Sequence, residues 1–262
     1  MSGAMSGATN EGRSGGRRLC MGEFLGDPLK DKVHIVGILD DGIYSLPLKT
    51  IDLLHHTDLM FGGERHLALF PNHTAKKVPI ESNLKEIAET IASHLGKLQM
   101  AVLASGDPNF YGIAEYLVGR LGKEAVEINP NVSTLQLAFA RIKERWDGAF
   151  LASVHGRPME KIIESVRHAE RAGLFTDDKN TPAEIARRLL ESGVENRTAY
   201  VCENLCGPDE RITATDLKGL TEKTFSSLNV LIILKREDPA FIHHVKEEPE
   251  MPPPGVDEEG RI

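Results

Sequence analysis

The chain has 262 residues, of which 40% are hydrophobic and 27% are charged, and its formal net charge is −8. This composition is typical of a soluble globular protein of one or two domains, and no apolar run reaches the roughly 20 residues that cross a bilayer. The acidic balance disfavours nucleic acid as a partner, because phosphates need a basic surface.

The two ends of the chain differ in composition from its middle. Residues 1–31 contain a Gly- and Ser-rich stretch without an apolar core, so we expect a disordered lead-in rather than a secretory signal. Residues 237–262 are acidic and Pro-rich, which predicts a disordered tail or a linker. The pair His243 and His244 lies there; it could bind a metal, but an exposed polar tail is the preferred interpretation. The expected location is the cytoplasm.

The three cysteines predict neither a disulfide framework nor a metal site. An odd, sparse set is atypical of disulfide-stapled proteins. Cys202 and Cys206 have the spacing C-x3-C, but no second pair or nearby His completes four ligands.

Apolar runs alternate with helical patterns through the first half of the folded region. Strands are predicted at residues 33–38, 101–104 and 125–128. Asn83, with Glu86 three residues later, predicts the start of a helix that ends near Gly96. Further helices are predicted around residues 113–121 and 135–142.

The same alternation continues in a second block. Strands are predicted at 149–154, 173–176, 199–202 and 228–234, and a helix at 158–169. Thr181 followed by Pro182 and Glu184 predicts another helix start. The pattern indicates an α/β fold with mostly parallel sheets, in two α/β domains at residues 32–146 and 147–236.

Four loops that follow predicted strands are candidates for a site, because ligands of open α/β sheets bind where loops leave the carboxyl ends of strands. Residues 37–42 read G-I-L-D-D-G and lack the G-x-G-x-x-G fingerprint, so an NAD site is not expected. Residues 105–112 read S-G-D-P-N-F-Y-G, in which Gly106 permits close backbone approach and Asp107 can accept hydrogen bonds.

The other two loops have simpler alternative interpretations. In residues 129–134, Ser133 or Thr134 either caps the following helix or receives a ligand carboxylate. Residues 203–212 read E-N-L-C-G-P-D-E-R-I and are either a polar hairpin loop or part of the site.

Taken in order, six motifs closely resemble the tetrapyrrole methylase family over residues 33–236. They are G-x-x-D-D-G, G-G-x-R-H-L, S-G-D-P-x-F-Y-G, P-N-V-S-T-L-Q, S-x-H-G-R and E-N-L-x-x-P-D-E-R-I. The segments at residues 63–67 and 154–157 are similar to the subgroup that methylates C-5 of a precorrin or cobalt-precorrin in cobalamin biosynthesis.

The resemblance implies two α/β domains with S-adenosylmethionine in the cleft between them, and a homodimer. Carried over by position, the cofactor contacts would come from Leu39, Gly106, Asp107, Phe110, Ser133, Thr134, Asn204 and Leu205. The chain departs from many relatives at Leu39-Asp40, where they have Gly-Pro.

The resemblance also implies a corrinoid precursor as substrate, which carries several carboxylates. The candidate substrate-binding residues are Asp41, Arg65, His66, His155 and Arg157. Arginine suits two-point binding of carboxylates, although a surface salt bridge or a buried histidine are alternatives. No general base is assigned. Cobalt-containing and cobalt-free substrates both stay open.

Three other hypotheses remain. The chain could act on another corrinoid or tetrapyrrole position, or bind tetrapyrrole or cofactor without catalysis. Its Pro-rich end could also lead to a fused C-15 methyltransferase that decarboxylates, as in some relatives, or such an enzyme could be a separate protein.

Overall fold

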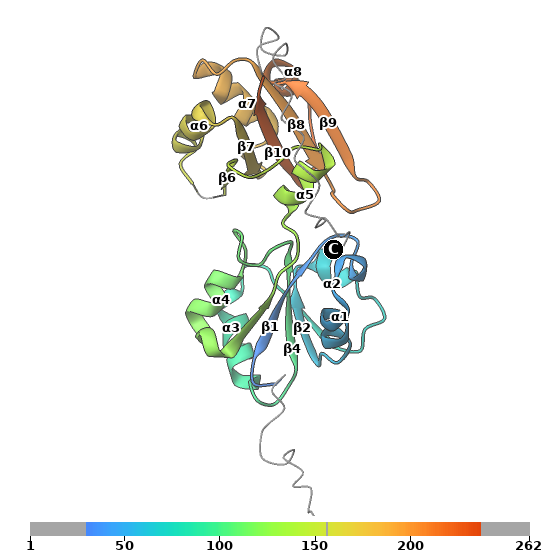
Figure 1. Ribbon diagram of the computed structural model, residues 1–262. Helices are drawn as coiled ribbons and strands as arrows, with labels where there is room; N and C mark the ends of the chain where they lie inside the picture. Colours follow the sequence, from blue (N-terminus) through green and yellow to red (C-terminus); the bar gives the residue numbers. More distant parts are fainter. Residues whose placement is uncertain (1–29, 156, 237–262) are drawn as a thin grey trace, which may run out of the picture.

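The computed structural model describes residues 30–155 and 157–236, which form two five-stranded sheets with helices on their faces (Figure 1). The α/β class predicted from the sequence is confirmed. The first sheet contains β1 (Val33–Ile38), β2 (Leu59–Gly62), β3 (Lys76–Pro79), β4 (Met100–Ser105) and β5 (Val126–Asn129). The second contains β6 (Phe150–Ser153), β7 (Arg171–Phe175), β8 (Arg197–Glu203), β9 (Arg211–Asp216) and β10 (Asn229–Lys235).

The first sheet is parallel and covered on both faces. Its helices are α1 (Leu48–His55), α2 (Glu64–Ala68), α3 (Leu84–His94) and α4 (Ala114–Leu121), with short 3-10 turns at η1 (Ile43–Ser45) and η2 (Lys123–Ala125). Side chains of α3 and α4 pack on one face, and those of α1 and α2 on the other (Figure 1). All six residues of β1 are buried, as expected for a strand between two helical layers.

The strand order of the first sheet, β3-β2-β4-β1-β5, determines where a ligand can bind. The connection after β1 leads to β2 on one side, and the connection after β4 leads to β5 on the other side. Because the connections that follow the neighbouring strands β1 and β4 run to opposite sides of the sheet, a crevice forms beyond the carboxyl ends of these two strands.

The second sheet has the order β6-β7-β10-β8-β9, and only β6 and β7 are parallel. The other three pairs are antiparallel, so the expectation of mostly parallel sheets is wrong for this half. For β8 and β9 the physical reason is the loop between them, which is too short for the crossover that a parallel pair needs.

Helices cover the second sheet unequally. α6 (Met159–His168), α7 (Pro182–Glu191) and α8 (Leu217–Thr221) pack on one face. α5 (Thr134–Arg141) covers the other face, where Leu135 and Phe139 are fully buried against Val230 and Ile232. α5 therefore follows β5 of the first sheet in sequence but belongs to the core of the second. The sequence-based boundary between 146 and 147 stays a prediction.

Most predicted elements appear within a few residues of their expected bounds, and Thr181 caps α7 by accepting a hydrogen bond from the Glu184 amide. The helix start predicted at Asn83 is confirmed, but the Asn83 side chain makes no capping hydrogen bond. Asn83 precedes α3, but its side chain accepts from the Glu81 amide and donates to the Pro79 carbonyl instead. No prediction from the sequence covered the short elements α1, α2, α8, β2 and β3.

No helix within 30–155 and 157–236 is long and apolar enough to span a membrane. The predicted lead-in up to residue 29, the tail at 237–262, and Cys20 and the His243-His244 pair within them lie outside the described residues.

Candidate active site

Three loops converge at the carboxyl ends of β1, β4 and β5. A Cβ atom added to Gly37 in β1 would lie 1.9 Å from the Gly106 carbonyl oxygen and 2.7 Å from the Asn131 amide nitrogen. The absence of a side chain at Gly37 therefore lets the loops at residues 105–112 and 129–134 approach the loop at residues 37–42. Beside this junction lies a cavity of about 460 Å3, lined by both halves of the chain. Its size is typical of small-molecule sites.

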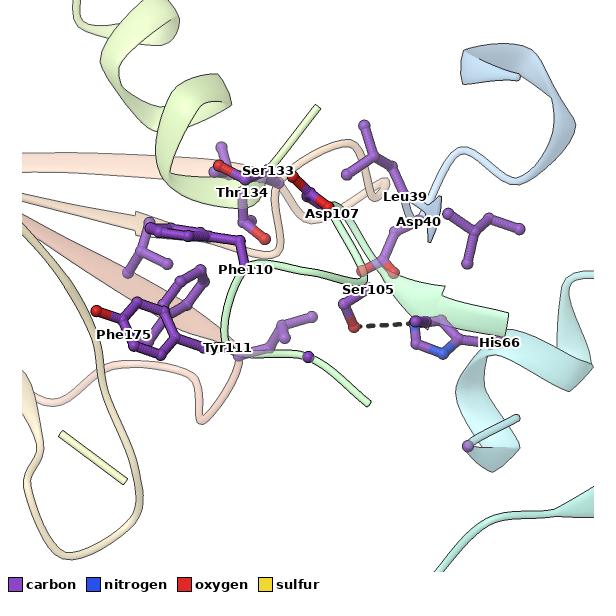
Figure 2. Close-up of a pocket in the computed structure, with 18 of the residues that line it drawn as sticks. Leu39, Asp40, His66, Ser105, Asp107, Phe110, Tyr111, Ser133, Thr134 and Phe175 are labelled. Atoms are coloured by element: carbon purple, nitrogen blue, oxygen red, sulfur yellow. Dashed lines mark hydrogen bonds between the residues drawn. The ribbon is translucent and has the colours of Figure 1, made fainter. Parts of the chain in front are cut away.

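All eight residues proposed from the resemblance as cofactor contacts line this cavity. Figure 2 labels Leu39, Asp107, Phe110, Ser133 and Thr134 among them. They are Leu39, Gly106, Asp107, Phe110, Ser133, Thr134, Asn204 and Leu205. Their role as cofactor ligands stays a prediction, but one cavity brings them together from four separate loops.

The loop after β4 has a shape that its glycines permit. Gly106 has φ +57°, a conformation that side chains rarely adopt, and a Cβ there would be 3.1 Å from Ser133 Cα. At Gly112 a Cβ would lie 2.4 Å from the Pro108 carbonyl oxygen. Asp107 Oδ1 accepts a hydrogen bond from the Asn109 amide at 2.9 Å. The motif S-G-D-P-x-F-Y-G therefore encodes a tight loop that presents Asp107 and Phe110 to the cavity.

At the loop after β5, the helix-cap interpretation is confirmed for Ser133. Its hydroxyl accepts from the Gln136 amide at 3.2 Å, and its own amide donates to Gln136 Oε1 at 3.0 Å. This reciprocal pair fixes the start of α5 and holds Ser133 and Thr134 at the cavity wall.

The loop between β8 and β9 is the polar hairpin that the sequence allowed, and its charges hold it in shape. Glu203, whose side chain is 1% exposed, accepts from Arg211 Nε at 2.7 Å and Nη2 at 2.8 Å, and from the Ser226 amide. The hydrogen bond from Arg211 lowers the pKa of Glu203. Asn204, at φ +50°, and Leu205 are thereby placed against the cavity.

A polar cluster lies on the first-half wall of the cavity. Arg65 Nη1 donates to both carboxylate oxygens of Asp40, at 2.5 and 2.6 Å, and Arg65 Nη2 donates to Ser105 Oγ at 3.2 Å. His66 Nε2 lies 3.1 Å from Ser105 Oγ (Figure 2). Burial, and then the charge of Arg65, lower the pKa of His66 to about 4. His66 is therefore a neutral imidazole near pH 7.

This cluster changes the interpretation of Arg65. The sequence left two interpretations of Arg65 open, a substrate-binding cation or a member of a surface salt bridge, and the structure pairs Arg65 with Asp40. Asp40 and Ser105 were not proposed from the sequence. The one available signal was the departure from the relatives' Gly-Pro at Leu39-Asp40, which placed a carboxylate in the first loop.

The remaining substrate candidates occupy different places. His155 lines the cavity, with Nδ1 3.0 Å from Ser153 Oγ. Arg157 stands beside it, with its guanidinium 4.4 Å from the Tyr111 ring. Neither Asp41 nor Arg157 is among the described residues that line the cavity. Gly156, between the two basic residues, lies outside the described residues.

Neither cysteine in the described part offers a reactive thiolate. Burial raises the pKa of Cys202 to about 12 and also raises the pKa of Cys206. Over 30–155 and 157–236, no three His, Cys, Asp or Glu side chains are grouped to hold a metal ion.

The chain is similar to proteins of known family. The sequence profile of the tetrapyrrole (corrin/porphyrin) methylases matches residues 32–221. The cobalt-precorrin-7 C(5)-methyltransferase of Salmonella typhimurium is 33% identical over 178 residues, which are 68% of this chain and 87% of the relative. The precorrin-6Y C(5,15)-methyltransferase [decarboxylating] of a Sinorhizobium species is 30% identical over 184 residues, but the match spans only 43% of it.

Solved structures share the fold at lower identity. A cobalt precorrin-4 methyltransferase superposes with a TM-score of 0.69 at 19% identity, covering 80% of this chain and 98% of the other. A uroporphyrin-III C-methyl transferase of Thermus thermophilus, complexed with S-adenosylhomocysteine, gives 0.64 at 21% identity, covering 78% and 97%.

Proposed function

The chain belongs to the tetrapyrrole (corrin/porphyrin) methylases, and from this premise we propose that it transfers a methyl group from S-adenosylmethionine to C-5 of a precorrin in cobalamin biosynthesis. The observation that carries the proposal is the cavity between the two sheets. It gathers loops that are far apart in sequence at the switch point of a parallel sheet.

The cavity suits S-adenosylmethionine in size and in the chemistry of its lining. Asp107 and Asn204 supply polar groups that can bind hydroxyl and amine donors, and Leu39, Phe110 and Leu205 supply apolar surface. Gly106 lines the cavity without a side chain, which allows close contact between its backbone and a ligand.

When bound, the sulfonium of the cofactor supplies an electrophilic methyl group. Asp107, Asn204 and Leu205 would hold this methyl donor, and the ring carbon would gain the methyl group in exchange for a proton, which water would accept. The protein's residues act by position. Holding carbon and methyl in line can account for roughly 7–11 kcal/mol of the barrier.

The methyl-transfer assay tests the function directly. We expect purified protein to move a labelled methyl group onto a precorrin, with one added methyl in the product mass, and the assay should be run with cobalt-containing and cobalt-free substrate. S-adenosylhomocysteine should raise the melting temperature, with a stabilisation of about 2.7 kcal/mol at a hundredfold excess over its Kd.

Each possible outcome of these assays corresponds to one of the hypotheses. Cofactor and corrinoid binding without turnover would indicate a non-catalytic binder. Methylation at another carbon, located by NMR, would indicate a different tetrapyrrole substrate. A folded protein that shows no thermal shift at millimolar S-adenosylhomocysteine would contradict the cofactor assignment.

The assembly we propose is a homodimer in the cytoplasm, working before or beside a C-15 methyltransferase. The name of the Sinorhizobium relative includes C-15 methylation and decarboxylation, but this chain matches less than half of that relative's length. We therefore assign those activities to a separate protein or to a fused module.

The dimer is expected to bury an apolar patch on the first half. Tyr44 and Leu48 are 90% and 84% exposed, beside the partly exposed Ile43, and large apolar side chains so exposed are typical of contact surfaces. Replacing both Tyr44 and Leu48 with Glu should give a folded monomer of half the sedimenting mass at micromolar concentration. A parent protein that sediments only at 28.8 kDa would contradict the dimer.

A further inference from the structure

Tyr111 has an unusual backbone conformation at the cavity. It follows Phe110 in the loop after β4, has φ +57°, and lines the cavity with 45% of its surface exposed. A bulky residue in the left-handed region is strained and persists only where its surroundings hold it there. Such strain is typical of functional sites.

The side chain of Tyr111 reaches across the cavity to the second half. Its hydroxyl donates to the Leu151 carbonyl of β6 at 3.1 Å, and its ring lies 6.0 Å from that of Phe175, edge to face (Figure 2). The Arg157 guanidinium carbon lies 4.4 Å from the centre of the same ring. Arg157 Nη1 also donates to the Ser153 carbonyl at 3.1 Å. The ring and this carbonyl thus orient one guanidinium.

Arg157 differs from the other arginine near the cavity in its charge balance. Arg65 is paired with Asp40, whereas Arg157 forms no salt bridge with any residue of the described ranges. Stacking on an aromatic ring leaves the in-plane N–H donors of a guanidinium available, and those donors match a carboxylate. The cavity-lining His155 stands two residues away.

We propose that Tyr111 is a positioning residue, which holds the Arg157 guanidinium at the edge of the cavity so that it binds a peripheral carboxylate of the tetrapyrrole. The inference rests on the proposed function and adds to it. It assigns the anionic contact to Arg157 rather than to Arg65, and it gives the strained Tyr111 backbone a role. Tyr111 acts through Arg157 and touches no reacting atom.

The test compares Tyr111→Phe, Tyr111→Leu and Arg157→Gln with the parent, using precorrin-6Y and cobalt-precorrin-7 as substrates. KM and kcat are measured, together with the Kd of S-adenosylhomocysteine and the Kd of precorrin-6Y by absorbance titration. Tyr111→Leu removes the ring, and a lost cation–π contact should raise the KM about 3- to 10-fold with little change in kcat. Tyr111→Phe keeps the ring and should stay within about twofold of the parent.

Arg157→Gln should raise the KM at least about tenfold, as for a lost charge-assisted hydrogen bond. The double variant Tyr111→Leu, Arg157→Gln should be no worse than Arg157→Gln alone, because the ring then has nothing to orient. The affinity for S-adenosylhomocysteine should be unchanged throughout. If Tyr111 had only a structural role, Tyr111→Leu would instead change the affinities for both S-adenosylhomocysteine and precorrin-6Y. Its effect on the KM would then add to that of Arg157→Gln.

Tyr111→Asn provides a second variant if Tyr111→Leu fails to fold, because Asn tolerates the left-handed conformation. It should fold and show the same rise in KM. If the parent methylates precorrin and Tyr111→Leu or Tyr111→Asn has the same KM as the parent, the inference is overturned but the proposed function is not. A parent that neither binds nor methylates precorrin would overturn the proposed function, and the inference with it.

Discussion

Replacing Gly37 with Ala should abolish detectable binding of S-adenosylhomocysteine and lower the free energy of unfolding by about 1–3 kcal/mol. The added methyl group would stand 1.9 Å from the Gly106 carbonyl oxygen and 2.7 Å from the Asn131 amide nitrogen, both backbone atoms. Neither backbone atom can move without its loop, so the loops after β4 and β5 would have to move away from β1. Thermal melts with and without the ligand measure both effects.

Gly119 provides the matched control. It lies within α4, and an added Cβ there would meet no atom within 4 Å. Gly119→Ala should leave ligand binding intact and stabilise the helix by about 1 kcal/mol. If Gly37→Ala bound S-adenosylhomocysteine as the parent does, the convergence of the three loops would not be what shapes the cavity.

Replacing Glu203 with Gln should cost roughly 2 kcal/mol of stability at pH 7, as for lost hydrogen bonds to a charged group. The buried carboxylate accepts two hydrogen bonds from Arg211 and one from the Ser226 amide. The uncharged amide can accept through its oxygen only, and its NH2 would face donors. The hairpin that carries Asn204 and Leu205 should loosen, which chemical denaturation and ligand titration would both detect.

The pH dependence of this effect has a definite sign. The pKa of Glu203 is lowered in the folded protein from an ordinary value of 4.5, chiefly by the hydrogen bond from Arg211. Its stabilisation is therefore fully present above pH 4.5 and is lost as the pH falls through the folded pKa. The difference between parent and Glu203→Gln should be full at pH 7 and shrink below pH 4.5. A difference constant from pH 7 to 3 would mean that charge is not its source.

The exposed pair of Glu170 and Lys235 serves as the control for this prediction. These side chains are 66% and 53% exposed, and such pairs contribute little to stability. Glu170→Gln should match the parent across the same pH range.

Local patterns predicted much of the fold. Continuous apolar runs identified β1 and β4, and the cap and proline at Thr181 and Pro182 identified the start of α7. Strands of four residues such as β2 and β3 carry too few positions to show a period. In β9, Ile212 and Ala214 alternate with polar residues, but none of its six residues is buried, because β9 lies at the edge of its sheet.

The sequence predicted which loops form the candidate site, but not the side-chain contacts within it. Loops after parallel strands meet at one edge, so the motifs placed Gly106, Asp107 and Ser133 together. The pairing of Asp40 with Arg65 could not be predicted, because 25 residues separate them and no periodicity links them. Likewise, the contact of Tyr111 with Arg157 depends on the approach of two sheets, which sequence spacing does not encode.

The position of α5 limits how the protein can be divided. A fragment ending at residue 146 would carry α5 without the sheet that buries Leu135 and Phe139, and a fragment beginning at 147 would expose Val230 and Ile232. Each would present an apolar surface prone to aggregation. A chimera that exchanges halves between relatives should therefore be joined in the loop between β5 and α5, so that each sheet keeps its own helix. In such a hybrid the first parent would supply the strand ends, and the second would supply the capped helix that completes the wall.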